Sequence, residues 1–179
     1  YSYTVNQANS QVEALAPTQT LTEVFNYTIV DGSSLTSSAK LTITLNGAND
    51  APTATAYPES STVVEDLAGF VNTALILADP DLGASFALKL AVDSGRLLVD
   101  PAAATTANTA GITIKGSDTG TLTLTGNMAD ITNWLQGDVI KYAAPPNALG
   151  ANIATLTFSA NDGSGFVPLG TQSLSATAS

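Results

Sequence analysis

The sequence predicts an all-β protein made of β-sandwich modules in tandem, of which the first is only partial. Apolar and polar residues alternate over many short runs, which is the pattern of half-buried strands. Turn signals such as DGSS, KGSDTG and NDGSG separate these runs. Hydrophobic residues make up 44% of the 179 residues and charged residues only 11%. This composition suits strands with small polar outer faces and is poor for helices.

The alternating runs place each expected strand along the chain. Strands are predicted at 1–5, 24–30, 39–45, 71–78, 86–92, 96–99, 111–115, 120–125, 138–142, 153–160 and 171–177, with weaker extended segments near 53–57 and 61–64. Two stretches predict short helices, 9–16 and 127–137. In the second, Asn127 is the expected N-cap and Trp134 is expected to plug one end of the core rather than to stack on a ligand.

The charge balance and the missing residue types exclude several classes of function. Five basic residues face 15 acidic ones, giving a net charge of -10, which argues against nucleic acid and anionic membrane surfaces as partners. The chain has no Cys and no His, so disulfides, Cys/His metal sites and Ser-His or Cys-His nucleophile pairs are impossible. No apolar run is long enough to span a membrane. The acidic excess serves either solubility or oxygen ligation of a hard cation.

A repeated strand–turn–strand unit divides the chain. FNYTIVDGSS at 25–34 aligns without gaps with LTFSANDGSG at 156–165, so Asp31 corresponds to Asp162, and Ile43 corresponds to Leu174 in the following strands. Because only 24 residues precede the first hairpin, we expect residues 1–48 to be the C-terminal part of a sandwich, 49–52 a linker and 53–179 a nearly complete sandwich. The missing strands would be cut away, encoded elsewhere or supplied by another chain.

Two known families share these residues. Residues 1–52, with ALAPTQTLTEVFNYTIVDG and the closing LTITLNGANDAP, resemble the C-terminal half of a VCBS repeat of very large bacterial surface proteins. Residues 52–179, with VVED, LADPDLG, GTLTLTG and TLTFSANDGSG, resemble the cadherin-like Ig modules of RTX-type adhesins. The resemblance implies Greek-key sandwiches joined end to end, with calcium at the joints.

The resemblance also implies a ligand set for that joint. The linker pair corresponds to Asn49 and Asp50, the D-x-D of the second module to Asp79 and Asp81, and the acid of its F–G turn to Asp162. The acid of the preceding module corresponds to Glu23. Gly47 stands where cadherin linkers carry an Asp, which implies fewer ions or weaker binding.

The strand order of a Greek key gives the same convergence, because the B–C turn, the F–G turn and the linker then meet at the end where the chain enters. Clustered carboxylates repel one another unless a cation neutralises them, and Ca²⁺ accepts six to eight oxygen ligands in tolerant geometry. The simpler interpretation is that these Asp and Asn residues only cap turns.

Three function classes compete at this point. The leading hypothesis is a non-catalytic extender or scaffold segment of a secreted bacterial adhesin at the cell surface, joined to neighbouring modules, with a ligand-binding domain inserted or adjacent. The second is a glycan- or protein-binding sandwich, for which Tyr57, Tyr142 and Phe166 are the candidate platforms, although the aromatic residues are expected mostly to face inward. The third, a two-carboxylate glycosidase, is disfavoured because the acids lie in turns.

Overall fold

The computed structural model describes residues 2–81 and 86–179, and the chain is mostly β, which confirms the predicted all-β class. Two compact units are present: Tyr1–Asp50 with Pro80–Gly83, and Ala51–Asp79 with Ala84–Ser179. The Greek-key path of the strands stays a prediction.

The first unit consists of a helical turn and one long hairpin. Helix α1 (Ser10–Glu13) precedes strands β1 (Thr20–Val30) and β2 (Thr36–Asn46), which pair antiparallel over their full length. The predicted helix over 9–16 is therefore shorter, starting from Asn9, whose side chain accepts the amide of Gln11 at 3.0 Å. The predicted strand at 1–5 is wrong for residues 2–5, which form no strand, and residue 1 lies outside the described residues.

The two faces of this hairpin differ in chemistry. Cross-strand partners share a face, so the register assigns every side chain to one side or the other. One side, which we call the hairpin's apolar face, carries Leu21, Glu23, Phe25, Tyr27, Ile29, Ser37, Ala39, Leu41, Ile43 and Leu45. The other side is made of Thr, Ser, Asn and Lys side chains, apart from Val24 and Val30. A hairpin patterned in this way normally buries its apolar face.

The second unit contains three sheets in the described part of the chain. Its strands are β3 (Thr53–Ala56), β4 (Ser60–Val64), β5 (Ala68–Phe70), β6 (Ile76–Ala78), β7 (Phe86–Val92), β8 (Arg96–Val99), β9 (Thr113–Lys115), β10 (Thr121–Gly126), β11 (Ile140–Ala143), β12 (Gly150–Asn161) and β13 (Val167–Thr177). A six-stranded sheet has the order β4-β13-β12-β7-β10-β9, a three-stranded sheet the order β5-β11-β8, and β3 pairs with β6. All pairs are antiparallel except β13 with β4.

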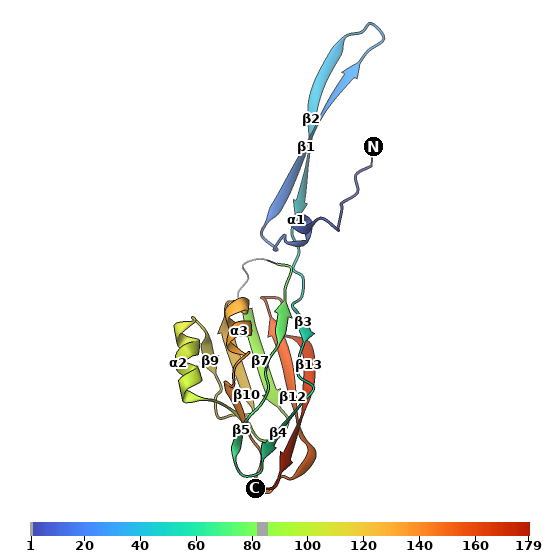
Figure 1. The fold of residues 1–179 in the computed structure, drawn as a ribbon. Helices are drawn as coiled ribbons and strands as arrows, with labels where there is room; N and C mark the ends of the chain where they lie inside the picture. The colour runs from blue at the N-terminus through green and yellow to red at the C-terminus, as the bar shows by residue number, and fades with distance from the viewer. Residues whose placement is uncertain (1, 82–85) are drawn as a thin grey trace. The chain divides into compact units, whose positions relative to one another are not determined.

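Strand β7 lies at the centre of this unit (Figure 1). Leu90 pairs with Phe158 of β12 on one side and with Leu122 of β10 on the other, and all three side chains are fully buried. Every second residue of β7 and β12 points into one core with Leu97, Ile140 and Tyr142 of the smaller sheet. The period-two alternation read from the sequence is thus the inward–outward alternation of these strands.

Two helices cover this core. Helix α3 (Met128–Trp134) starts at Asn127, whose side chain accepts the amide of Ala129 at 2.9 Å, as predicted. Helix α2 (Pro101–Thr109) was not predicted, although Asp100 caps it and proline occupies its first turn. Trp134 is buried and its Nε1 donates to the carbonyl of Ala103 at 3.0 Å, which confirms its place in the core.

Two further expectations are wrong. The predicted strand over 71–78 begins only at Ile76, because the preceding residues turn locally, with the amide of Leu75 donating to the carbonyl of Thr73. The aromatic side chains do not mostly face inward. Six are at least 40% exposed: Tyr3, Phe25, Tyr27, Tyr57, Phe70 and Phe166. Tyr142, a candidate platform, is fully buried.

We expect the ion pair at the start of α2 to give the protein part of its acid sensitivity. Lys141 Nζ lies 2.9 Å from Asp100 Oδ2, and this hydrogen bond, with that from the Ala102 amide, holds the pKa of Asp100 below its ordinary value. A lowered folded-state pKa gives stability that is present at neutral pH and is lost as the pH falls through that pKa. Asp100→Asn keeps the cap and removes the pair.

Urea unfolding of the wild type and of Asp100→Asn, followed by circular dichroism from about pH 2 to pH 7, checks this expectation. The variant should be less stable at neutral pH, and the difference should shrink toward the acid end of the range. A difference that stays constant with pH would show that the Asp100 charge is not its source.

Tyr142→Phe tests a buried polar atom in the core. Tyr142 is fully buried, its hydroxyl has no hydrogen-bond partner among the described residues, and burial, helped by the charge of Asp93, raises the pKa of the phenol. Removing an unsatisfied buried hydroxyl should raise the free energy of unfolding by about 1 kcal/mol. Denaturant titration measures this, with the cavity-forming Tyr142→Leu as a destabilised control. A loss of stability in Tyr142→Phe would mean that the hydroxyl is satisfied.

Candidate metal centre

Three aspartates, Asp79, Asp81 and Asp162, come together after the ends of β6 and β12. Asp79 and Asp81 follow β6 directly, with Pro80 between them, and Asp162 follows the last residue of β12. The register pairs Asn161 with Ala87, so the end of β12 and the start of β7 lie side by side. The fold thus brings together aspartates about 80 positions apart in the chain, two directly after β6 and one directly after β12.

The three carboxylates are close enough to share one ion. One oxygen from each of Asp79, Asp81 and Asp162 lies within 4.8 Å of the others. Asp81 is 6% exposed and Asp162 is 4% exposed, whereas Asp79 is half-buried. Burying an ionised carboxylate is costly unless hydrogen bonds and opposite charge compensate it. This cluster could therefore hold a metal ion, and with no His or Cys in the chain its side-chain donors are all oxygen.

Hydrogen bonds already orient two of the three groups. The amide of Asp50 donates to Asp81 Oδ2 at 2.8 Å. Asp162 Oδ1 accepts from the amide of Ser164 at 3.1 Å and from its hydroxyl at 2.8 Å. Both carboxylates act as hydrogen-bond acceptors in these contacts, which fixes the orientation of their side chains.

Asn161 and Asp162, at the turn that follows β12, have different roles. In the first hairpin Asp31 Oδ1 accepts the amides of Ser33 and Leu35, two and four residues on. In the second hairpin Asn161 makes the equivalent pair of bonds, to the amides of Gly163 and Gly165, both of which have positive φ. Asn161 thus accepts the two turn amides that Asp31 accepts in the first hairpin. The carboxylate of Asp162 belongs instead to the cluster with Asp79 and Asp81. The sequence alignment, which matched Asp31 with Asp162, missed this exchange.

The remaining predicted ligands occupy other positions. Asn49 donates through Nδ2 to the carbonyl of Asp50 at 3.1 Å, and both residues are half-buried. Glu23 lies on the hairpin's apolar face, where the hydroxyl of Tyr3 donates to its Oε2 at 3.1 Å. Among the described residues, neither Asp50 nor Glu23 belongs to the group of carboxylates that could share an ion.

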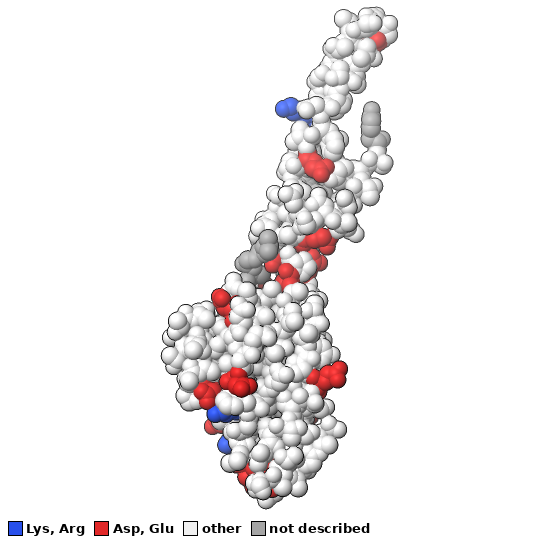
Figure 2. All heavy atoms as spheres, in the orientation of Figure 1, with Lys and Arg blue, Asp and Glu red and all other residues white. Residues whose placement is uncertain are grey.

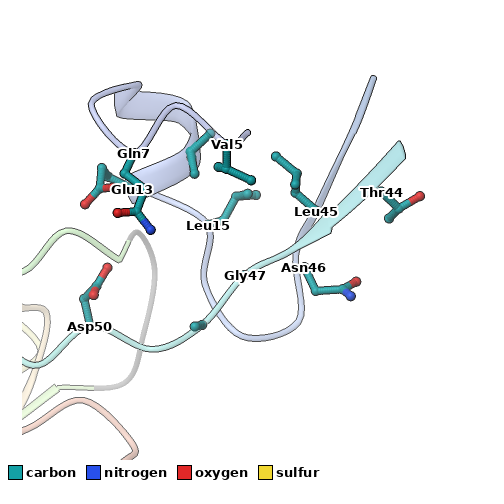
Figure 3. A pocket seen from close by; sticks show the side chains of 11 residues that line it. Val5, Gln7, Glu13, Leu15, Thr44, Leu45, Asn46, Gly47 and Asp50 are labelled. Carbon is teal, nitrogen blue, oxygen red and sulfur yellow. The ribbon is translucent and has the colours of Figure 1, made fainter. Parts of the chain in front are cut away.

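The carboxylate of Asp50 lines a separate cavity within the first unit. This cavity, about 580 Å³ in volume, lies between the segment around α1 and the end of β2 (Figure 3). Val5, Leu15 and Leu45 provide apolar walls. Gly47 must be a glycine here, because a Cβ atom would lie 2.2 Å from the carbonyl oxygens of Leu15 and Ala16. Glu13 and Asp50 supply the carboxylates that line the cavity.

Charge elsewhere on the molecule is sparse. Acidic groups and a few basic ones appear as isolated patches over a mostly uncharged surface (Figure 2). Only two ion pairs are found in the described residues, Arg96 with Asp118 at 2.8 Å and Lys141 with Asp100. The Arg96–Asp118 pair is well exposed to solvent, so it contributes little to stability. The cluster of Asp79, Asp81 and Asp162 is therefore the main concentration of buried negative charge that we describe.

Comparison with known proteins adds no identity to this site. No protein-family model matches the chain, and no curated protein matches it. Within the described ranges, none of the helices has the length and apolar character needed to cross a bilayer. The candidate metal centre therefore rests on its own geometry: three carboxylate oxygens within 4.8 Å of one another, two of them on buried residues.

Proposed function

We propose that this chain is a non-catalytic structural segment of a large bacterial adhesin, exported to the cell surface, in which Ca²⁺ stiffens the chain where its two modules join. The observation that supports this proposal is the cluster of Asp79, Asp81 and Asp162 in a chain whose only strong side-chain donors are oxygen atoms. The partners would be neighbouring modules of the same chain and a ligand-binding domain inserted or adjacent to them.

Calcium suits this cluster better than other cations. Three carboxylates supply up to six oxygen atoms, and backbone carbonyls and water supply more, which matches the six to eight ligands of Ca²⁺. Mg²⁺ requires a near-ideal octahedron at shorter distances and gives up its water reluctantly. Zn²⁺, Cu²⁺ and Fe²⁺ prefer nitrogen or sulfur ligands, and this chain has no His and no Cys.

The bound ion would stiffen the chain because its binding is coupled to the folded arrangement of the site. Ca²⁺ binds the folded arrangement of Asp79, Asp81 and Asp162 and not the unfolded chain, so it stabilises that arrangement by mass action. The amide of Asp50, in the predicted linker 49–52, donates to Asp81 Oδ2 and so connects that linker to a carboxylate of the cluster. Binding would therefore restrict the chain on both sides of residues 50 and 81, and an extender segment needs such a restriction to hold its modules at a fixed angle.

A second candidate function is a glycan- or protein-binding sandwich. It is favoured by the exposed aromatic side chains, which the sequence had led us to expect inside. Tyr57 packs against Gly170 but stays 41% exposed, and Phe166 lies under the ammonium of Lys89, 4.5 Å from its ring centre. Exposed rings are the usual contact surface for sugars and for protein partners.

Removal of calcium tests the leading proposal. We expect millimolar Ca²⁺ to raise the melting temperature relative to excess chelator, with a gain of about 2.7 kcal/mol when the ion is a hundredfold above its Kd. Mg²⁺ at the same concentration should give a much smaller shift. Differential scanning calorimetry gives the shift, and isothermal titration gives the affinity and the number of ions.

Asparagine variants separate metal binding from folding. Asp81→Asn and Asp162→Asn should abolish the calcium shift, and both should melt at or above the wild-type temperature in chelator, because they relieve carboxylate repulsion. Asp118→Asn, which changes an exposed acid in a turn, serves as the matched control and should keep the full shift. If the wild type shows no calcium shift, or the three variants behave alike, the proposed metal centre is refuted.

A further inference from the structure

We propose that the outer edge of β1 binds one further β-strand, an extended polypeptide segment in which every second side chain is aliphatic. The segment would pair antiparallel to β1 and extend the hairpin's apolar face by one strand. The proposal does not depend on the calcium site. It rests on a comparison of the two hairpins of this chain, one of which is fully surrounded by its own sheet.

The two hairpins share one register. Three cross-strand pairs of β1 and β2 recur in β12 and β13 at a constant separation of 131 residues along the chain. The pairs are Glu23–Ile43, Phe25–Leu41 and Tyr27–Ala39 in the first hairpin, and Ala154–Leu174, Leu156–Gln172 and Phe158–Gly170 in the second. Because side chains alternate between faces, a matching register means that the same positions face the same way in both hairpins.

The second hairpin shows which strands such a hairpin accepts. Strand β7 pairs antiparallel with β12, and β4 pairs parallel with β13. The aliphatic side chains of β7 stand opposite the inward positions of β12: Val92 opposite Leu156, Leu90 opposite Phe158 and Leu88 opposite Ala160. All three of these β12 side chains are fully buried.

The equivalent positions of the first hairpin are not covered. Phe25 is 45% exposed, Tyr27 51% and Ile29 62%. In the described part of the chain β1 and β2 pair only with each other, so each has one edge without a strand. Isolated two-stranded hairpins are marginally stable in water, and exposed edges recruit further strands. The site therefore has both the backbone edge and the apolar face that strand addition requires.

An existing contact already extends along this face. The ring of Tyr3 packs edge-on against Phe25 with centroids 6.2 Å apart, and its hydroxyl bonds to Glu23. The N-terminal segment thus contacts this face at Glu23 and Phe25 and leaves Tyr27 and Ile29 exposed, where the added strand would pair with β1.

Charge favours a strand from a neutral or basic segment over a second copy of this chain. Each copy carries a net charge of -10, which opposes association of two copies. The hairpin itself, from Thr20 to Asn46, holds only three charged residues, Glu23, Asp31 and Lys40. Strand β7, the equivalent neighbour in the second unit, combines aliphatic residues with Lys89, so its sequence is a suitable probe.

The test uses the full chain and a peptide with the sequence of residues 86–92, FALKLAV, extended by lysines for solubility. Titration is followed by NMR of the labelled protein in excess chelator, which removes any contribution of the calcium site. We expect saturable shifts of the backbone amides of β1, Thr20–Val30, that exceed those of β12 and β13. No change in β1 would overturn the proposal.

Paired variants identify the face. Ile29→Ser removes an aliphatic side chain from the hairpin's apolar face and should weaken peptide binding by about tenfold or more. Val24→Ser makes the same kind of change on the opposite face of the same strand, where Val24 is 53% exposed, and should change binding by less than about twofold. Equal effects of the two variants would contradict the predicted register.

A change in the peptide keeps the test valid if Ile29→Ser unfolds the hairpin. A peptide in which the two central leucines are replaced by serine, FASKSAV, leaves the protein unaltered and should lose binding. Sedimentation of the free protein tests whether a second copy of the chain occupies the edge of β1 instead. A dimer whose formation protects the β1 amides, together with no binding of FALKLAV, would refute the proposal in favour of self-association.

Discussion

The antiparallel pairing of β7 with β12 is the constraint on which the second unit depends. It sets the inward alternation of both strands, so that Leu88 and Leu90 enter the core with Phe158. The turn that follows β12 holds Asp162 beside Asp79 and Asp81. A slip of one residue would turn the leucines outward and shift Asp162 along the sheet. The core and the position of Asp162 in the candidate metal centre therefore both depend on this register.

The sequence predicted most strands well because alternate side chains of a strand point to opposite faces of the sheet, so an apolar residue at every second position marks the buried face. It failed where local chemistry overruled composition. Helix α2 forms in a segment of Ala and Thr because Asp100 caps it and a proline occupies its first turn. These two signals carried less weight in the prediction than the overall composition, which is poor for helices. Residues 71–75 look like a strand by hydrophobicity, yet Val71 and Leu75 are buried without belonging to one. An apolar run predicts burial more reliably than it predicts backbone conformation.

The candidate site was harder to derive than the fold. The internal repeat aligned Asp31 with Asp162. This alignment is correct for the strands, but in the turn the residue equivalent to Asp31 is Asn161, one position earlier. The cause is an irregularity in the pairing of β12 with β13 between Phe158 and Ser159. It moves the turn's hydrogen-bond acceptor to Asn161 and leaves Asp162 buried beside Asp79 and Asp81. A bulge is invisible in a gapless alignment, and here it converts a turn-forming acid into a candidate ligand.

The two hairpins also separate what a sequence pattern specifies from what stabilises it. Over residues 23–27 and 154–158 both have the same register and the same inward positions, yet Phe158 is fully buried and its counterpart Tyr27 is half exposed. The difference lies in the neighbours, because β12 and β13 are flanked by β7 and β4 and their inward side chains share a core with the smaller sheet. The alternation of apolar and polar residues therefore predicts that a strand needs neighbours to bury its apolar side, as well as predicting the strand itself. In the described part of the first unit, Tyr3 covers part of the apolar face at Glu23 and Phe25, and a strand with the aliphatic spacing of β7 would extend that face along β1.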